Sequence, residues 1–452
     1  MKEDFFVNRQ QSGKIPPGPS ASEAQNFWES PFESLAKLTR EYGDIVSLDE
    51  KTHRVYLLNH PDYIKHVLQS NYRNYTNHAD SFKLIVGNGL SVSEGDFWLR
   101  QRRMMQPAFH RQSIEALLPA MVEEIETLIT DWQVIAEHGK SIDVLTEMTN
   151  VMTTISAKTM FGVDLQEEIQ ALTLALTTAQ EYIYYRGWDH LEQNKNDLSP
   201  ETIQFYQARE TIDKIAYHII SEGRKNPQRD HNLLAMLLHA SDEETGAGMS
   251  EEQIRDEVVT MLLAGRETIA VTLTWIYYVL SIYPDIERRV HAEIEHVLGK
   301  RSPTFQDLYK LPYTRMVIDE VLRFYPTSWL IARRSIDPDE IGGYAIPQNS
   351  EIFINPYTVH RHSSFWENPD QFDPERFSPE QIAKRSHFSY LPFGAGPRVC
   401  IGNNFALFAM QPVLAMTIQA YKMYLISEHL IQPQARILLQ PSSNVVMKLQ
   451  RR

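Results

Sequence analysis

The chain contains a single cysteine, Cys400, and the residues around it constrain its structure more than any other stretch. The segment from Phe393 to Gly402 reads FGAGPRVCIG, and an apolar run that predicts a helix follows it. Gly394 and Gly396 allow backbone angles and close approaches that a side chain would forbid. A thiolate just before a helix can accept backbone N–H groups and lies at the positive end of the helix dipole. The sequence therefore predicts a thiolate that stays deprotonated and holds a metal.

A lone cysteine in a soluble chain is more often a small buried hydrophobic residue than a ligand. Here the pattern Phe-Gly-x-Gly-x-Arg-x-Cys-x-Gly resembles the heme-binding loop of the cytochrome P450 family. The resemblance implies that Cys400 is the axial ligand of heme b iron. It also implies that Phe393 packs near the thiolate, that Arg398 binds a heme propionate, and that Gly402 belongs to the same cofactor-binding loop.

The resemblance implies a fold that is mainly α, a single-domain cytochrome P450 fold with a long central helix and small β-sheets. Of the 452 residues, we expect 1–30 to form an N-terminal extension and 31–452 to form the cytochrome P450 domain. No linker rich in Gly, Ser or Pro divides the chain, and 42% of its residues are hydrophobic. A single large core is therefore expected.

Apolar periodicity predicts helices along most of the chain. They cover 31–42, 61–69, 97–110, 114–137, 145–161, 165–185, 201–224, 251–282, 284–298, 311–324 and 403–421. Strand patterns occur at 45–48, 55–58, between 331 and 355, and beyond 422, whereas 71–95 is expected to be an irregular loop. The uninterrupted pattern over 251–282 is the longest and predicts the central helix.

The middle of this helix, from Ala264 to Thr268, reads AGRET and resembles the family's oxygen-activation motif. A mid-helix glycine costs about 1 kcal/mol relative to alanine. We therefore expect Gly265, with Ala264 beside it, to let the helix lie close over a flat cofactor. Thr268 is expected to donate a hydrogen bond to the carbonyl of Ala264 and open the helix locally. We predict that Glu267 and Thr268 form a catalytic acid–alcohol pair, although such a dipeptide alone is more often a solvent-facing Glu beside a helix-bending Thr.

Other residues are expected to contact the cofactor edge. Trp98 and Arg102 lie four residues apart and share one face of a helix. The family uses such a Trp-x-x-x-Arg pair to donate hydrogen bonds to a heme propionate. The resemblance gives Arg333 a second propionate-binding position, for which Arg334 is a rival that the sequence does not separate.

Glu320 and Arg323 form a Glu-x-x-Arg motif, which alone indicates little more than a surface ion pair. The segment Pro-Glu-Arg-Phe at 374–377 resembles a family segment whose arginine, here Arg376, joins that pair in a buried network. We expect these three residues to have a structural role and to lock the loop that presents Cys400.

The residues expected to contact substrate are almost all apolar. They are Phe82, Leu84, Val86, Leu90, Met261, Ser328, Leu330, Ile331 and Ile437. For those in the 71–95 loop, the alternative is that they only pin an irregular loop to the core. We expect an apolar small-molecule substrate of fatty-acid, terpenoid or polyketide type, and a place in secondary metabolism.

The net charge of −14 argues against a nucleic-acid partner. The first 19 residues contain no apolar run long enough to span a bilayer, so we expect no transmembrane anchor, a cytoplasmic location and a monomer. Nothing resembling a reductase follows Cys400. Electrons are therefore expected from a ferredoxin or flavodoxin with its reductase, docked on a basic patch of Arg100, Arg103, Lys384 and Arg385.

Together the motifs predict a soluble bacterial-type monooxygenase that inserts one oxygen atom from O2 into its substrate. One alternative is a peroxide-dependent peroxygenase or hydroperoxide-rearranging enzyme of the same fold. Another is a non-catalytic heme-thiolate sensor, and a third is a helical scaffold without heme. The intact Glu267–Thr268 pair favours the monooxygenase over the first two.

Overall fold

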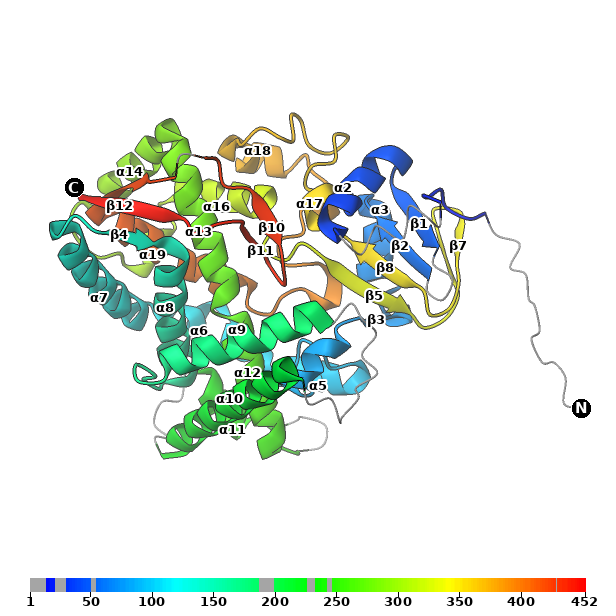
Figure 1. Ribbon diagram of the computed structural model, residues 1–452, viewed down its shortest axis with the longest axis horizontal. Helices are drawn as coiled ribbons and strands as arrows, with labels where there is room; N and C mark the ends of the chain where they lie inside the picture. Colours follow the sequence, from blue (N-terminus) through cyan, green and yellow to red (C-terminus); the bar gives the residue numbers. More distant parts are fainter. Residues whose placement is uncertain are drawn as a thin grey trace, which may run out of the picture.

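The computed structural model describes residues 14–20, 30–49, 54–186, 199–225, 232–241, 246–427 and 429–452. Most of the expected N-terminal extension lies outside these ranges. Within them, Lys14 and Pro17 are attached to the domain, because their carbonyls accept the backbone N–H groups of Ala345 and Ser47. The described chain is mainly helical, with small sheets at its edges (Figure 1).

Most predicted helices are confirmed, with bounds that shift by a few residues. The helices are α2 (Pro31–Tyr42), α3 (Pro61–Lys65), α4 (Lys83–Val86), α5 (Gly95–Met105), α6 (Arg111–Glu115), α7 (Leu118–Glu137), α8 (Val144–Ser156), α9 (Ile169–Arg186), α10 (Pro200–Lys225), α11 (Leu233–His239), α12 (Glu251–Ala264), α13 (Glu267–Ile282), α14 (Pro284–Leu298), α15 (Phe305–Leu308), α16 (Pro312–Phe324), α17 (Pro356–Val359), α18 (Pro379–Ile382) and α19 (Asn403–Ala420). Prolines in the first turn begin α2, α14 and α16, as their fixed φ favours.

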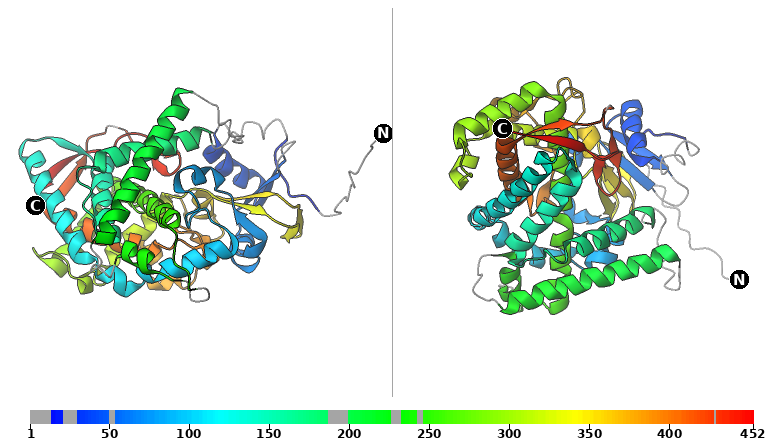
Figure 2. Two further views of the ribbon diagram at one scale, coloured as in Figure 1. Left: turned by 90° about the horizontal axis from the view of Figure 1, so that it is seen from below. Right: turned by 60° about the vertical axis from the view of Figure 1, so that its left-hand side comes forward.

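The strands form four sheets within the described ranges. They are β1 (Ile45–Asp49), β2 (Arg54–Leu58), β3 (Tyr75–Asn77), β4 (Ser141–Asp143), β5 (Ile331–Ser335), β6 (Asp339–Ile341), β7 (Tyr344–Ile346), β8 (Glu351–Ile354), β9 (Tyr421–Leu425), β10 (Pro433–Ala435), β11 (Leu439–Pro441) and β12 (Val446–Arg451). The largest sheet has the order β1-β2-β8-β5-β3, with β2 and β8 parallel. Figures 1 and 2 show these blue and yellow strands at one end of the molecule and the red strand β12 within the helical half.

The helical half packs around α13, whose residues from Ile269 to Leu280 are all buried. A helix that is apolar on every side belongs in the centre of a large core. Among the described residues, 251–282 is also the one helical stretch long and apolar enough to cross a bilayer. Because 72% of its most apolar window is buried inside the protein, its composition matches that of a core helix.

The central helix is interrupted, whereas the sequence predicts it as continuous. It divides at Gly265 and Arg266 into α12 and α13. Thr268 Oγ1 donates to the carbonyl of Ala264 at 2.7 Å, which confirms the predicted bond, and Ser156 Oγ donates to the carbonyl of Gly265 at 3.2 Å. At the break, side-chain hydroxyls donate the hydrogen bonds that backbone N–H groups would donate to these carbonyls in a continuous helix. A Cβ on Gly265 would also lie 3.1 Å from Met160 Cε, so the glycine admits close packing.

The segment 71–95 is more regular than predicted. Tyr75–Asn77 forms β3 against β5, and Lys83–Val86 forms the single helical turn α4, which ends at Gly87 with a φ of 57°. A turn of four residues is too short to produce a recognisable apolar period. The prediction of an irregular loop is therefore wrong over these residues.

Candidate active site

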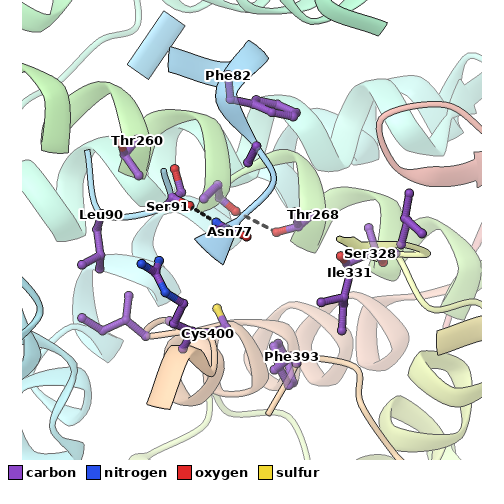
Figure 3. Close-up of a pocket in the computed structure, with 18 of the residues that line it drawn as sticks. Asn77, Phe82, Leu90, Ser91, Thr260, Thr268, Ser328, Ile331, Phe393 and Cys400 are labelled. Atoms are coloured by element: carbon purple, nitrogen blue, oxygen red, sulfur yellow. Dashed lines mark hydrogen bonds between the residues drawn. The ribbon is translucent and has the colours of Figure 1, made fainter. Parts of the chain in front are cut away.

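A cavity of about 1100 Å³ lies between the central helix and the cysteine loop (Figure 3). Its wall comes from the segment before α5, from α5 itself, from α12 and α13, from the residues around β5, and from 392–410. Typical small-molecule sites hold about 300–1,000 Å³. The cavity therefore has room for a large cofactor together with a substrate.

Cys400 lies on one wall of this cavity, and Thr268 on the central helix lies on the opposite wall (Figure 3). The cysteine loop closes on itself, because the N–H of Cys400 donates to the carbonyl of Phe393 at 2.9 Å. Gly394 and Gly396 have φ of 70° and 71°, and a Cβ on Gly396 would lie 1.8 Å from a backbone oxygen of Leu68. The glycines are needed to turn the chain and to seat the loop.

Burial raises the pKa of the Cys400 thiol, while the N–H of Gly402 and the charge of Arg102 act in the opposite direction. Burial has the larger effect. The thiolate that holds a metal stays a prediction, because this pKa shift belongs to the metal-free thiol. A coordinated metal ion deprotonates a thiol outright, so ionisation at this position requires the metal.

A group of half-buried cations lines the cavity beside the cysteine loop. Arg102 Nη1 donates to the carbonyl of Val399 at 2.7 Å. The Arg398 guanidinium lies 4.4 Å from the centre of the Trp98 ring. Arg333 Nη1 donates to Asn77 Oδ1 at 2.8 Å. We call Arg102, Arg333 and Arg398 the arginine cradle.

Burial lowers the pKa of each arginine in the cradle, that of Arg333 to about 10, so all three keep their charge at neutral pH. Like charges gathered at a partly desolvated wall are costly unless anions accompany them. The cradle therefore suits a ligand with carboxylates at one edge, and Cys400 offers a sulfur ligand for its metal. Both features fit heme b.

The two candidate arginines on β5 face different partners. After burial, the charge of Arg398 lowers the pKa of Arg333 and that of Glu94 raises it. Arg334 Nη2 instead lies 3.3 Å from a carboxylate oxygen of Glu351. Both arginines line the cavity, but Arg334 is already paired with Glu351, so Arg333 is the better placed of the two for a carboxylate of the cofactor.

The opposite wall includes Ala264, Gly265 and Thr268. Glu267 is not part of it. Its Oε2 accepts a hydrogen bond from Gln180 Nε2 on α9 at 2.7 Å. Consecutive helix residues point about 100° apart, so the predicted acid–alcohol pair is not assembled around the cavity.

Seven of the nine predicted substrate contacts line the cavity: Phe82, Leu90, Met261, Ser328, Leu330, Ile331 and Ile437. Leu84 and Val86 do not. Val86 is completely buried in the main core and Leu84 packs against that core. The helical turn α4 directs them inward, which the prediction of an irregular loop does not anticipate.

The segment bearing Leu90 is held to α12 by two neighbouring acidic side chains. Asp256 accepts the N–H of Asn88 at 2.7 Å, and Glu257 accepts that of Leu90 at 3.0 Å. A Cβ on Gly87 would lie 2.2 Å from Oδ1 of Asp256. Burial raises the pKa of Glu257 to about 8. This acid holds its proton at neutral pH and positions one wall of the cavity.

The Glu-x-x-Arg pair is fully buried. Arg323 Nε and Nη2 donate to the two oxygens of Glu320 at 2.6 and 2.8 Å. Arg376 joins at longer range, with its Nε 3.6 Å from Glu320 Oε1, and donates to backbone carbonyls instead. The predicted network exists, with Arg376 as an ion-pair neighbour and not a hydrogen-bond donor to Glu320.

A residue that sequence reasoning missed connects this pair to the cysteine loop. His360 Nδ1 lies 3.1 Å from the carbonyl of Arg323, and its Nε2 accepts the N–H of Leu391 at 2.8 Å. Burial lowers the pKa of His360 well below its usual value, which suits a neutral ring that donates through one nitrogen and accepts through the other. No signal in a single sequence distinguishes this histidine from the chain's others.

One member of the predicted basic patch is not available to a partner. The Arg385 guanidinium lies 3.9 Å from the centre of the Trp366 ring and donates to the carbonyl of Arg376. Arg103 and Lys384 are exposed, and Arg100 is half-buried.

Among the described residues, no group of three or more His, Cys, Asp or Glu side chains could hold a metal ion.

Comparison with known families gives a match to the model described as cytochrome P450 over residues 18–449. Similar proteins include the cyclooctat-9-en-7-ol 5-monooxygenase of Streptomyces melanosporofaciens, 35% identical over 84% of this chain and 82% of that protein. The cyclooctatin synthase of the same organism is 34% identical over 94% and 93%. The pentalenene oxygenase of Streptomyces avermitilis is 30% identical over 90% and 89%.

A solved structure has the same fold. The crystal structure of the cytochrome P450DA heme domain superposes with a TM-score of 0.86 and covers 97% of this chain and 96% of that one. The two sequences are 23% identical. The likeness confirms the predicted mainly α architecture with a central helix and small sheets.

Proposed function

The chain belongs to the cytochrome P450 family, and from that premise we propose that it oxygenates a terpenoid using electrons from a separate redox partner. Membership makes it a heme-dependent monooxygenase of mainly α fold. The observation that carries the finer proposal is an apolar cavity wall facing Cys400, with the arginine cradle at its edge.

We assign Cys400 as the iron ligand and the arginine cradle, with Trp98, as the site for the heme carboxylates. When bound, the heme supplies the activation of dioxygen that no side chain of the cavity can perform. The protein residues orient this group and exclude bulk water. Phe393, beside Cys400 on the cavity wall, shields the sulfur.

The terpenoid class is supported by the lining of the cavity and by the relatives. Phe82, Leu330 and Ile437 are apolar, as are most of the predicted contacts that line it. Ser328 is exposed to the cavity and makes no hydrogen bond within the described part of the chain. A largely hydrocarbon substrate that carries a hydroxyl group would match the apolar part of this wall and could pair with the Ser328 hydroxyl.

Proton supply is assigned to Thr268, whose hydroxyl lies on the cavity wall and already donates to Ala264. Glu267 is held behind it by Gln180. We propose that Glu267 exchanges protons with Thr268 through a side-chain rotation or an intervening water, because the two residues adjoin on α13.

The remaining assignments are a ferredoxin or flavodoxin with its reductase as electron donor, a cytoplasmic location and a monomeric state. Exposed cations such as Arg103 and Lys384 support an acidic donor. Oxygenation of a small apolar molecule does not require a nucleic acid or a second copy of the chain.

The test is a carbon-monoxide difference spectrum of the reduced protein, followed by turnover assays. We expect a thiolate-type spectrum that Cys400→Ala abolishes, and oxygenation of cyclic terpene alcohols with reductant and O2. A terpene alcohol should bind more tightly than the same terpene without its hydroxyl group. The Ser328→Ala variant should bind the two equally. Turnover with peroxide alone would favour a peroxygenase instead, and ligand binding without turnover by any donor would favour a sensor.

A further inference from the structure

We infer that Glu94, which belongs to no recognised motif, is a cofactor-positioning residue that anchors the arginine cradle and sets its charge. Glu94 directly precedes α5, the helix that carries Trp98 and Arg102. It is not among the residues that line the cavity. It acts on the cofactor site through the side chains that it holds.

Each oxygen of the Glu94 carboxylate has a separate partner. Oε2 accepts from Arg398 Nη2 at 2.5 Å, and Oε1 accepts the backbone N–H of Asn77 at 2.6 Å. Asn77 in turn accepts Arg333 Nη1 through its Oδ1 and donates to the carbonyl of Ser91 at 2.6 Å, a bond drawn in Figure 3. One carboxylate thereby connects β3, β5 and the cysteine loop.

The charges of this group match the proposed ligand. The cradle contributes three positive charges. Glu94 is the one acid whose carboxylate forms an ion pair with a cradle arginine within the described residues. Two positive charges therefore remain, and heme b carries two carboxylates. Replacing Glu94 by a neutral residue would leave the half-buried Arg398 without an anion.

A cofactor-positioning role for Glu94 predicts different results from a purely structural role in holding the loop. If the role were purely structural, replacing Glu94 would lower the stability of the fold and leave the heme's electronic properties unchanged. An anion near the cofactor site disfavours the reduced heme, which carries one more electron, so its removal should raise the midpoint potential. Release of Arg398 and Asn77 should also let the heme leave faster.

The experiment uses the purified heme-loaded protein. It compares the wild type with Glu94→Gln, which keeps the shape and an acceptor for Asn77, and with Glu94→Asp, which keeps the charge. Asp96→Asn is the matched control, because Asp96 is an exposed acid in the first turn of the same helix. The readouts are the midpoint potential from an equilibrium redox titration and the rate of heme transfer to excess apomyoglobin.

We expect Glu94→Gln to raise the potential and to release heme about tenfold faster, as for loss of a charged hydrogen bond. Glu94→Asp should keep the potential near that of the wild type, and so should Asp96→Asn. Asn77→Ala should release heme faster with an unchanged potential, and it remains informative if Glu94→Gln does not fold. Equal potentials for Glu94→Gln and the wild type, or an equal shift in Asp96→Asn, would overturn the proposal.

Discussion

Single side chains hold the site together across large separations in sequence. His360 bridges Arg323 to Leu391, and Glu257 bridges α12 to Leu90. The roles of Cys400 and Thr268 could be predicted, because the motif residues on which each prediction rests lie within a few positions of it. A hydrogen bond between residues 90 and 257 leaves no local pattern, which is why the sequence did not predict the roles of Glu257 and His360.

The buried Glu257 makes stability depend on pH. Its pKa is about 8 in the folded protein and near the usual 4.5 in the unfolded chain, so folding takes up a proton between these values. The contribution of Glu257 to the free energy of unfolding is complete below about pH 4.5 and is lost as the pH rises to 8. This contribution is at most about 5 kcal/mol. Glu257→Gln should lack this component and gain stability over the wild type at pH 8.5.

Denaturant unfolding at pH 6 and pH 8.5, followed by circular dichroism, measures this effect. Glu252→Gln is the control, because Glu252 is exposed on the same helix. Identical pH dependence of the midpoint for Glu257→Gln and the wild type would show that Glu257 is already ionised when buried.

Among the elements, the cysteine loop shows how strongly close packing can restrict a short segment. Its glycines were predicted from the need for unusual backbone angles, and the structure adds a contact between Gly396 and the backbone of Leu68. That contact joins segments more than 300 residues apart and could not be predicted. Helices with proline or glycine at their ends, such as α14, matched their predicted bounds for a local reason.

Gly394 and Gly396 provide a matched pair for a test. Both have positive φ, so alanine strains either one by about 1–3 kcal/mol. A Cβ on Gly394 meets nothing within 4 Å, whereas on Gly396 it would lie 1.8 Å from a backbone oxygen. We expect Gly396→Ala to lose most of its heme, and Gly394→Ala to keep it with a modestly lower melting temperature. Equal heme content per protein chain in the two variants would contradict this reading.

At the scale of the whole molecule, the mainly α fold was predicted through the family resemblance, whereas the order of the sheet was not. Strand β2 pairs in parallel with β8, which joins residues near 55 to residues near 351. Periodicity indicates that a segment is a strand and not which strand it joins. The net charge of −14 also belongs to this scale, since it disfavours an acidic electron donor unless cations gather locally.

Charge reversal tests how the donor docks. The double variant Arg103→Glu, Lys384→Glu should be reduced more slowly by a ferredoxin, about tenfold at low ionic strength, and should lose the salt dependence of the rate. Lys214→Glu, an exposed site on α10, is the control. Stopped-flow reduction of the heme measures the rate, and an unaltered salt dependence in the double variant would exclude these cations from the docking surface.

The cavity wall draws on residues from Asn77 to Ile437 in a chain of 452. At a synthesis rate of 5–20 residues per second, roughly 15–60 s separate the emergence of Trp98 from that of Cys400. Trp98 and Arg102 therefore emerge well before the sulfur ligand, whereas Arg398 emerges together with it. A complete site for the prosthetic group can therefore form only after Cys400 has been synthesised.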